Sequence, residues 1–234
     1  EVGDLARVEI TGGSAWELLF SLLPELPGVT ALGFESHILT ARDAGRLADP
    51  SRPWRFQPTT DIVEGLRAVK APEEIQAVRE AGAVATAALE LAAAAVRAGQ
   101  SETEIAALLE SALRRGGSEG YPFPTIVASG PRSALPHART SDRVVAPGDL
   151  LLLDFGAIVG GYCSDVTRTF VVGAAPTARQ AEIHALVRAA QRAALDGARA
   201  GLTGRQIDAL AREVISAAGH GEAFGHSLGH GVGL

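Results

Sequence analysis

The sequence predicts an α+β fold. Two pairs of helical segments, one within residues 72–117 and one ending at residue 219, flank a β-rich region whose last two strands are joined by a Gly-Gly dipeptide. Helices combined with antiparallel strands in one unit are typical of α+β domains. The predicted strands are residues 125–129, 150–159 and 162–172.

The composition argues against several classes of protein. With 21 basic and 27 acidic residues, the 234-residue chain carries a formal charge of −6, whereas nucleic-acid binding normally shows a basic excess. Hydrophobic residues make up 47% of the chain, yet no apolar run is long enough for a membrane span, so neither disorder nor a transmembrane helix is supported. The single cysteine, Cys163, excludes an intrachain disulfide and favours a reducing, cytoplasmic location. Because the chain begins at Glu1 and lacks methionine, we expect it to be part of a longer protein.

The N-terminal residues are expected to form part of a separate, smaller domain. The elements predicted there are helices at residues 16–23 and 40–47 and a strand at residues 29–34. Three prolines between positions 50 and 58 disfavour regular structure on either side of them. We therefore predict two domains, residues 1–58 and residues 59–234.

The later helices have recognisable ends and repeat along the chain. Pro72 suits a first helical turn, and Gly99 ends the predicted helix at residue 98. Ser101 and Glu104 form a capping-box pattern that opens a second helix. The same pattern returns 102 residues later and predicts an internal duplication. Its identities are Gly99, Ile105, Ala107, Leu108 and Gly117, which recur as Gly201, Ile207, Ala209, Leu210 and Gly219, while Thr203 replaces Ser101.

A β-hairpin is predicted around Gly160 and Gly161, a dipeptide that favours a two-residue turn. With that turn, Asp154 lies opposite Thr167, and Asp165 lies opposite Gly156. Because side chains alternate along a strand, Asp154, Asp165 and Thr167 project from the same face. The other face is apolar and is expected to pack under the helices; it consists of Leu151, Leu153, Phe155, Val159, Val166 and Phe170.

The two aspartates are diagonal neighbours on the polar face. Diagonal Cα atoms lie about 7–8 Å apart, which allows the two carboxylates to lean together. Ionised carboxylates that close repel unless a proton or a cation lies between them, and a pair of divalent metal ions is one solution. A surface hairpin with two hydrated aspartates satisfies the same spacing, so the pattern alone leaves both interpretations open.

Histidines form a second candidate cluster. His226 and His230 share a face in either a helix or a strand, and the glycines between and after them favour a strand. Ser227 stands where a zincin protease requires glutamate, which excludes that class. His137, which follows a proline in a predicted loop, carries no weight by itself.

Three segments, residues 123–137, 151–169 and 226–234, closely resemble the pita-bread metallopeptidases, and among these the proline-specific branch of prolidase and aminopeptidase P. The resemblance runs from about residue 61 to the end of the chain. It implies a pita-bread fold with an internal pseudo-two-fold duplication, preceded by part of a smaller α/β N-terminal domain.

The resemblance also implies roles for individual residues. Asp154, Asp165 and His230 match metal ligands, with Asp165 bridging two divalent ions. His137 and His226 match histidines that line the pocket and contact the substrate or the tetrahedral intermediate. The position of Thr167 opposite Asp154 adds a prediction of our own, a hydrogen bond to the Asp154 carboxylate, because ligating carboxylates usually receive such bonds.

The activity implied is hydrolysis of the Xaa-Pro bond of dipeptides or peptide N-termini by a hydroxide that bridges two metal ions. The substrate is a small peptide with proline at the second position, and a dipeptidase is favoured over an aminopeptidase P. Carboxylate ligands favour manganese, with cobalt and zinc as alternatives. The resemblance further implies a homodimer, which we expect in the cytoplasm.

The chain departs from the family pattern in one respect. The family completes its metal centre with two glutamates and another pocket histidine at positions that would follow Leu234. Because three ligands are too few for two ions, we expect the 234 residues alone to be inactive or to bind metal weakly. The alternative is a catalytically silent pita-bread module that binds proteins. The retained aspartates favour the enzyme, and they disfavour a metal-free, creatinase-like hydrolase, because clustered carboxylates repel without a cation.

Overall fold

The computed structural model describes residues 6–234, which form two compact units. One unit ends at Ala68 and the other comprises Val69–Leu234. Of the helices in the described residues, none combines the length and the apolar character that crossing a bilayer requires. The division into domains 1–58 and 59–234 stays a prediction.

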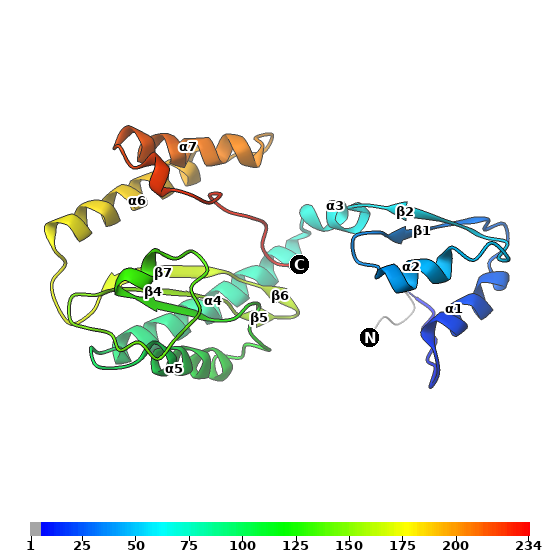
Figure 1. The fold of residues 1–234 in the computed structure, drawn as a ribbon, viewed down its shortest axis with the longest axis horizontal. Coiled ribbons are helices and arrows are strands. Elements are labelled where there is room, and N and C mark those ends of the chain that lie inside the picture. The colour runs from blue at the N-terminus through cyan, green and yellow to red at the C-terminus, as the bar shows by residue number, and fades with distance from the viewer. Residues whose placement is uncertain (1–5) are drawn as a thin grey trace. The chain divides into compact units, whose positions relative to one another are not determined.

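The first unit combines a two-stranded parallel sheet with short helices (Figure 1). The side chains of Ser14 and Thr40 cap its first two α-helices by accepting a hydrogen bond from a backbone N–H three residues later. The helices and the strand predicted in this region are confirmed. The elements are α1 (Ala15–Leu22), the 3-10 turn η2 (Leu23–Glu25), β1 (Ala31–Glu35), α2 (Ala41–Leu47), β2 (Arg55–Thr59) and α3 (Ile62–Ala68).

The expectation of irregular structure around Pro58 is wrong, because this residue lies within β2, opposite Phe34 of β1. Proline cannot donate a hydrogen bond to a ladder, so it is confined to strands with a free edge. In the described residues β2 pairs with β1 in a sheet of two strands, so it has such an edge.

In the second unit, α4 (Pro72–Ala95) and α5 (Glu102–Arg115) form a helical hairpin. The predicted start signals are confirmed: Pro72 lies in the first turn of α4, and Ser101 and Glu104 form the capping box of α5. The first helix ends before the predicted residue 98, because Val96 adopts an extended conformation and is buried in the core. A buried stripe of small residues on α4 permits close packing and comprises Ala81, Ala85, Ala88 and Ala92.

These two helices cover one face of an antiparallel sheet with the strand order β3–β4–β7. Its strands are β3 (Ile126–Ser129), β4 (Leu150–Phe155) and β7 (Val166–Val171), and β5 (Ile158–Val159) and β6 (Tyr162–Cys163) extend the hairpin to its turn. Asp154 pairs with Thr167, which confirms the predicted register. The predicted apolar face is also confirmed: Leu151, Leu153 and Phe155 are fully buried.

The predicted strands are continuous, whereas the structure interrupts both of them midway. Gly156 passes so close to the partner strand that a Cβ atom there would lie 2.0 Å from the carbonyl oxygen of Ser164. The Ser164 hydroxyl oxygen accepts a hydrogen bond from Ala157 N–H at 3.0 Å, and Ser164 N–H donates to the Ala157 carbonyl at 2.9 Å. This irregular crossing leaves Asp165 between β6 and β7, outside the regular ladder.

The second helical hairpin consists of α6 (Ala178–Gly197) and α7 (Gly204–Ala217), and in Figure 1 it lies on the opposite side of the sheet from α5. It repeats the local structure of the first hairpin. Thr203 forms a capping box as Ser101 does, and the preceding glycines, Gly201 and Gly99, have φ values of 92° and 94°. These features agree with the predicted duplication.

The glycine-rich C-terminal segment differs from the predicted strand. After the short turn η4 (Gly221–Ala223), residues 225–234 are irregular apart from a bridge between Cys163 and Gly233. Glycine has no side chain to pack and loses much conformational freedom on ordering, which weakens a strand. The bridge nevertheless ties this segment to the hairpin, because Cys163 N–H donates to the Gly233 carbonyl at 3.2 Å.

Candidate metal centre

The polar face of the β4–β7 hairpin carries the predicted carboxylate site. Asp154 is half-buried in β4, and the Thr167 hydroxyl on the opposite strand donates to its Oδ1 atom at 3.0 Å. The paired register produces this contact, since directly opposed side chains share a face. The predicted hydrogen bond between Thr167 and Asp154 is therefore present.

The electrostatics of Asp154 reflect a crowded negative site. Burial raises the pKa of its carboxyl above the ordinary value, and the nearby Asp165 carboxylate raises it further. The hydrogen bond from Thr167 and the charge of His137 oppose this effect, but the pKa stays raised. A carboxyl whose negative form is disfavoured in this way gains from a cation placed beside it.

His230 brings an imidazole nitrogen to the same cluster. Its Nε2 atom lies 3.2 Å from Oδ2 of Asp165, and its Nδ1 atom lies 2.7 Å from the carbonyl oxygen of Gly231. Because a carbonyl only accepts hydrogen bonds, Nδ1 carries the proton in this geometry. In the neutral ring, the lone pair of Nε2 then faces a carboxylate oxygen, an arrangement that a metal ion between the two atoms would satisfy.

The donor set of this cluster fits a divalent metal ion. It offers two carboxylates and one imidazole, which suit manganese, cobalt or zinc. Asp165 is central, since it lies close to both Asp154 and His230. The donor atoms of these three side chains do not all lie within 4.8 Å of one another, however. In the part of the chain that the structure describes, one group of three possible ligands lies that close together: His37, Asp61 and Glu64.

That tighter group belongs to the first unit, and all three of its residues are exposed. Its Glu64 accepts a hydrogen bond from His37 at 3.3 Å, so the contact is explained by an ordinary surface pair. The exposure of His37 agrees with an ordinary surface residue.

The remaining predicted histidines lie at two different places. His137 is exposed, in the loop that follows the 3-10 turn η3 (Gly130–Ala134), and its charge acts on Asp154. His226 packs edge-on against Phe224 and lines a cavity of about 610 Å³ between α6 and α7. The link between His137 and the carboxylate site is thus electrostatic, through the pKa of Asp154, while the contacts of His226 are with the second helical hairpin.

Two further cavities differ in chemistry. A small one of about 320 Å³ is lined by Asp165, His230 and Lys70, so a cation of the protein borders the carboxylate cluster. Lys70 is not among the residues predicted for the site, although it is the sole lysine among 21 basic residues, a signal that could have identified it.

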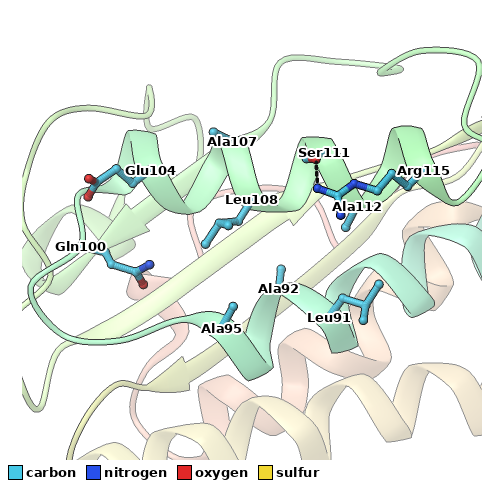
Figure 2. Close-up of a pocket in the computed structure, with 10 residues that line it drawn as sticks. All are labelled: Leu91, Ala92, Ala95, Gln100, Glu104, Ala107, Leu108, Ser111, Ala112 and Arg115. Atoms are coloured by element: carbon cyan, nitrogen blue, oxygen red, sulfur yellow. Dashed lines mark hydrogen bonds between the residues drawn. The ribbon is translucent and has the colours of Figure 1, made fainter.

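A groove of about 530 Å³ between α4 and α5 contains none of the predicted residues, and its Arg115 donates a hydrogen bond to the Ser111 hydroxyl (Figure 2).

Known proteins similar to this chain share both its sequence and its fold. Residues 76–234 match the model of metallopeptidase family M24. The chain is 40% identical over 209 residues to an Xaa-Pro dipeptidase of Pyrococcus horikoshii, an alignment that covers 89% of this chain and 59% of that protein.

Two solved structures are also similar. An Xaa-Pro dipeptidase from Bacillus anthracis has a TM-score of 0.90 at 43% identity, and the aligned region covers 95% of this chain and 62% of the dipeptidase chain. An X-Pro aminopeptidase from Thermotoga maritima has a TM-score of 0.88 at 40% identity, and the aligned region covers 93% of this chain and 61% of the aminopeptidase chain. The chain therefore spans less than two thirds of the length of these relatives.

Proposed function

Because the chain belongs to metallopeptidase family M24 and has its pita-bread fold, we propose that the protein hydrolyses the Xaa-Pro bond of dipeptides at a dinuclear metal centre. The observation that carries this proposal is the cluster on the polar face of the hairpin. Asp165 lies close to both Asp154 and His230, the position that a carboxylate bridging two ions would occupy.

Two divalent ions, when bound, would activate a water molecule as the nucleophile and polarise the scissile carbonyl. The protein's own residues prepare the ligands for this role. Thr167 holds Asp154 in one orientation through its hydrogen bond of 3.0 Å. The Gly231 carbonyl fixes the tautomer of His230, which leaves Nε2 as the ligating atom.

The two remaining histidines are assigned to the substrate. His137 lies in the loop after η3 and acts electrostatically on Asp154; a protonated ring at the substrate would stabilise negative charge that develops on the scissile carbonyl oxygen. His226 shares the C-terminal segment of His230, and we propose that it lines the substrate pocket. The support for His226 is the sequence resemblance and this shared segment.

The finer features of the enzyme are also proposals. Oxygen-rich ligation favours Mn²⁺ over Zn²⁺ or Co²⁺ at both positions. A cytoplasmic location is supported by the single cysteine, which cannot form an intrachain disulfide. A homodimer rests on the family resemblance, and light scattering of the full-length protein would measure it.

A second candidate activity is removal of an N-terminal residue from longer peptides whose second residue is proline. The similarity to the Thermotoga maritima aminopeptidase favours it, because its TM-score of 0.88 lies close to the 0.90 of the Bacillus anthracis dipeptidase. The distinction between the two activities depends on how the pocket closes behind proline.

The test is hydrolysis of an Xaa-Pro dipeptide and an Xaa-Pro-Xaa tripeptide by the full-length, metal-stripped protein, with and without added Mn²⁺. We expect Mn²⁺-dependent cleavage, faster for the dipeptide. Asp165→Asn should abolish it, whereas Asp196→Asn, which changes an exposed helix ion pair, should not. A folded wild-type protein that cleaves neither peptide with any divalent ion would refute the peptidase proposal and favour the silent binding module.

A further inference from the structure

Outside the carboxylate cluster, the most completely buried charge of the second unit belongs to Glu102. This residue begins α5, and its side chain is 0% exposed. Burial by itself would be costly for a carboxylate, because a buried charge must be paired and hydrogen-bonded. The partners of Glu102 therefore show what the charge is used for.

The two oxygens of this carboxylate bind two separate points of the chain. Oε1 accepts hydrogen bonds from the backbone N–H and the hydroxyl of Ser129, both at 2.8 Å. Oε2 accepts from the backbone N–H of Ser141 at 3.1 Å and from its hydroxyl at 2.6 Å. Every one of these donors is supplied by a residue at least 27 positions away in sequence.

Ser129 and Ser141 are the two ends of one loop. Ser129 is the last residue of β3, and the loop runs through η3 before it returns at Ser141. Arg132, inside the loop, donates to Oε2 of Glu102 at 3.2 Å and also to the backbone carbonyl of Arg139. One carboxylate thus fixes both ends of the loop and one point within it.

His137 lies in this loop, between the two residues that Glu102 holds. Two backbone hydrogen bonds lie within the loop, from Leu135 N–H to the Arg132 carbonyl and from Ala138 N–H to the Leu135 carbonyl. Besides Glu102, two threonines join the loop to the rest of the fold: the Thr140 hydroxyl bonds to Thr125 and Val127, and Thr103 donates its N–H and its hydroxyl to the Ser141 carbonyl. The place of His137 relative to Asp154 therefore depends on these attachments.

We propose that Glu102 is a positioning residue: its buried carboxylate holds both ends of loop 130–140 and so fixes the position of His137 within that loop. This inference rests on the proposed function, in which His137 contacts the substrate. It assigns a role in the reaction to a residue that touches neither substrate nor metal.

The test compares Glu102→Gln with Glu104→Gln in the full-length protein. Glu104 is the matched control, because it lies in the same helical turn but caps Ser101 N–H at 2.7 Å, at the rim of the groove in Figure 2. The NH2 group of a glutamine at position 102 would face the backbone N–H of Ser129 or of Ser141, which can only donate, so one side of the clamp would open. Ser141→Ala is a milder variant that removes one hydroxyl donor and leaves the charge.

We expect Glu102→Gln to lower kcat about 100-fold with little change in KM, the scale of effect that a misplacement of about 1 Å produces. In a His137→Ala background the same substitution should have no further effect, because the clamp acts through that histidine. Equal loss of kcat in both backgrounds would overturn the proposal. Ser141→Ala should show a smaller effect of the same kind.

Two measurements on the metal-free protein separate this inference from the proposed function. Amide hydrogen exchange of residues 130–140 should become faster in Glu102→Gln, and the ¹H–¹⁵N signal of the His137 ring should shift, while Glu104→Gln leaves both unchanged. Unchanged exchange and an unchanged ring signal would refute the clamp even in an active enzyme. If the wild-type protein cleaves no Xaa-Pro peptide, the proposed function fails, and these two readouts still decide the role of Glu102.

Discussion

Gly156 occupies the tightest contact of the hairpin and offers a sharp test of how the metal centre is built. A Cβ atom at this position would lie 2.0 Å from the Ser164 carbonyl oxygen and 2.6 Å from Cγ of Pro122. The first of these neighbours is backbone and cannot swing aside as a flexible side chain would. Substitution by alanine must therefore push the strand of Asp154 away from the segment that carries Asp165.

The expected cost follows from that overlap. Overpacking a well-filled core by one methyl group costs about 1–3 kcal/mol, and a contact of 2.0 Å with a carbonyl oxygen places Gly156→Ala at or above the upper end. The backbone of Gly156 does not have a positive φ, so the loss reflects collision rather than backbone strain. We expect the free energy of unfolding in urea to fall by about 3 kcal/mol, together with weaker Mn²⁺ binding.

Gly82→Ala is the matched control for this prediction. Gly82 lies within α4, and a Cβ atom there meets nothing within 4 Å. Alanine is favoured over glycine in a helix by about 0.5–1 kcal/mol, so this variant should be more stable than the wild type. If Gly156→Ala changed the unfolding free energy by less than 0.5 kcal/mol, roughly the scatter of neutral substitutions, the close crossing of the two strands would be refuted.

Three further predictions follow from individual side chains. Thr167→Val should lower Mn²⁺ affinity in calorimetric titration about 10- to 100-fold, because it removes the hydroxyl that orients Asp154; unchanged affinity would contradict this role. Asp154→Asn should abolish Mn²⁺ binding but stabilise the metal-free protein by about 0.2–1 kcal/mol, because it removes a repulsive cross-strand carboxylate; a less stable metal-free variant would count against this. For Glu102, burial raises the pKa, but the hydrogen bonds from Ser141 and Ser129 outweigh this effect, so the pKa of the folded state is lowered. The charged carboxylate therefore stabilises the fold above the unfolded pKa of about 4.3, and this stabilisation is lost as the pH falls through the folded pKa. Glu102→Gln should therefore cost about 3 kcal/mol in urea unfolding at pH 7 and progressively less below pH 4, whereas a pH-independent loss would argue against a charged Glu102.

The parts of the fold that the sequence predicts well are those governed by local chemistry. A Gly-Gly turn fixes the register of its strands, so the pairing of Asp154 with Thr167 follows from counting. Helix starts at Pro72, Ser101 and Thr203 follow from capping, which depends on residues at most three positions apart.

The parts that the sequence does not predict depend on contacts between distant residues. The interruption at Gly156 arises because Ser164 of the partner strand approaches it, and nothing in either local sequence shows that distance. Pro58 suggests irregular structure until β1 supplies a partner on one edge. The C-terminal segment is held by contacts with distant residues, among them the bridge to Cys163 and the pair of His230 with Asp165, rather than by its own strand propensity.

Glu102 and Asp154 show why burial and charge must be considered together when a functional carboxylate is sought. Glu102 is completely buried, yet its pKa is lowered, because donors from Ser129, Ser141 and Arg132 satisfy both oxygens. Asp154 is half-buried and its pKa is raised, because burial and the Asp165 carboxylate disfavour its charged form more than the single hydrogen bond from Thr167 favours it. The first carboxylate is complete within the protein and can serve only to hold other parts in place. The second still lacks positive charge, which is the property expected of a ligand that a divalent ion completes.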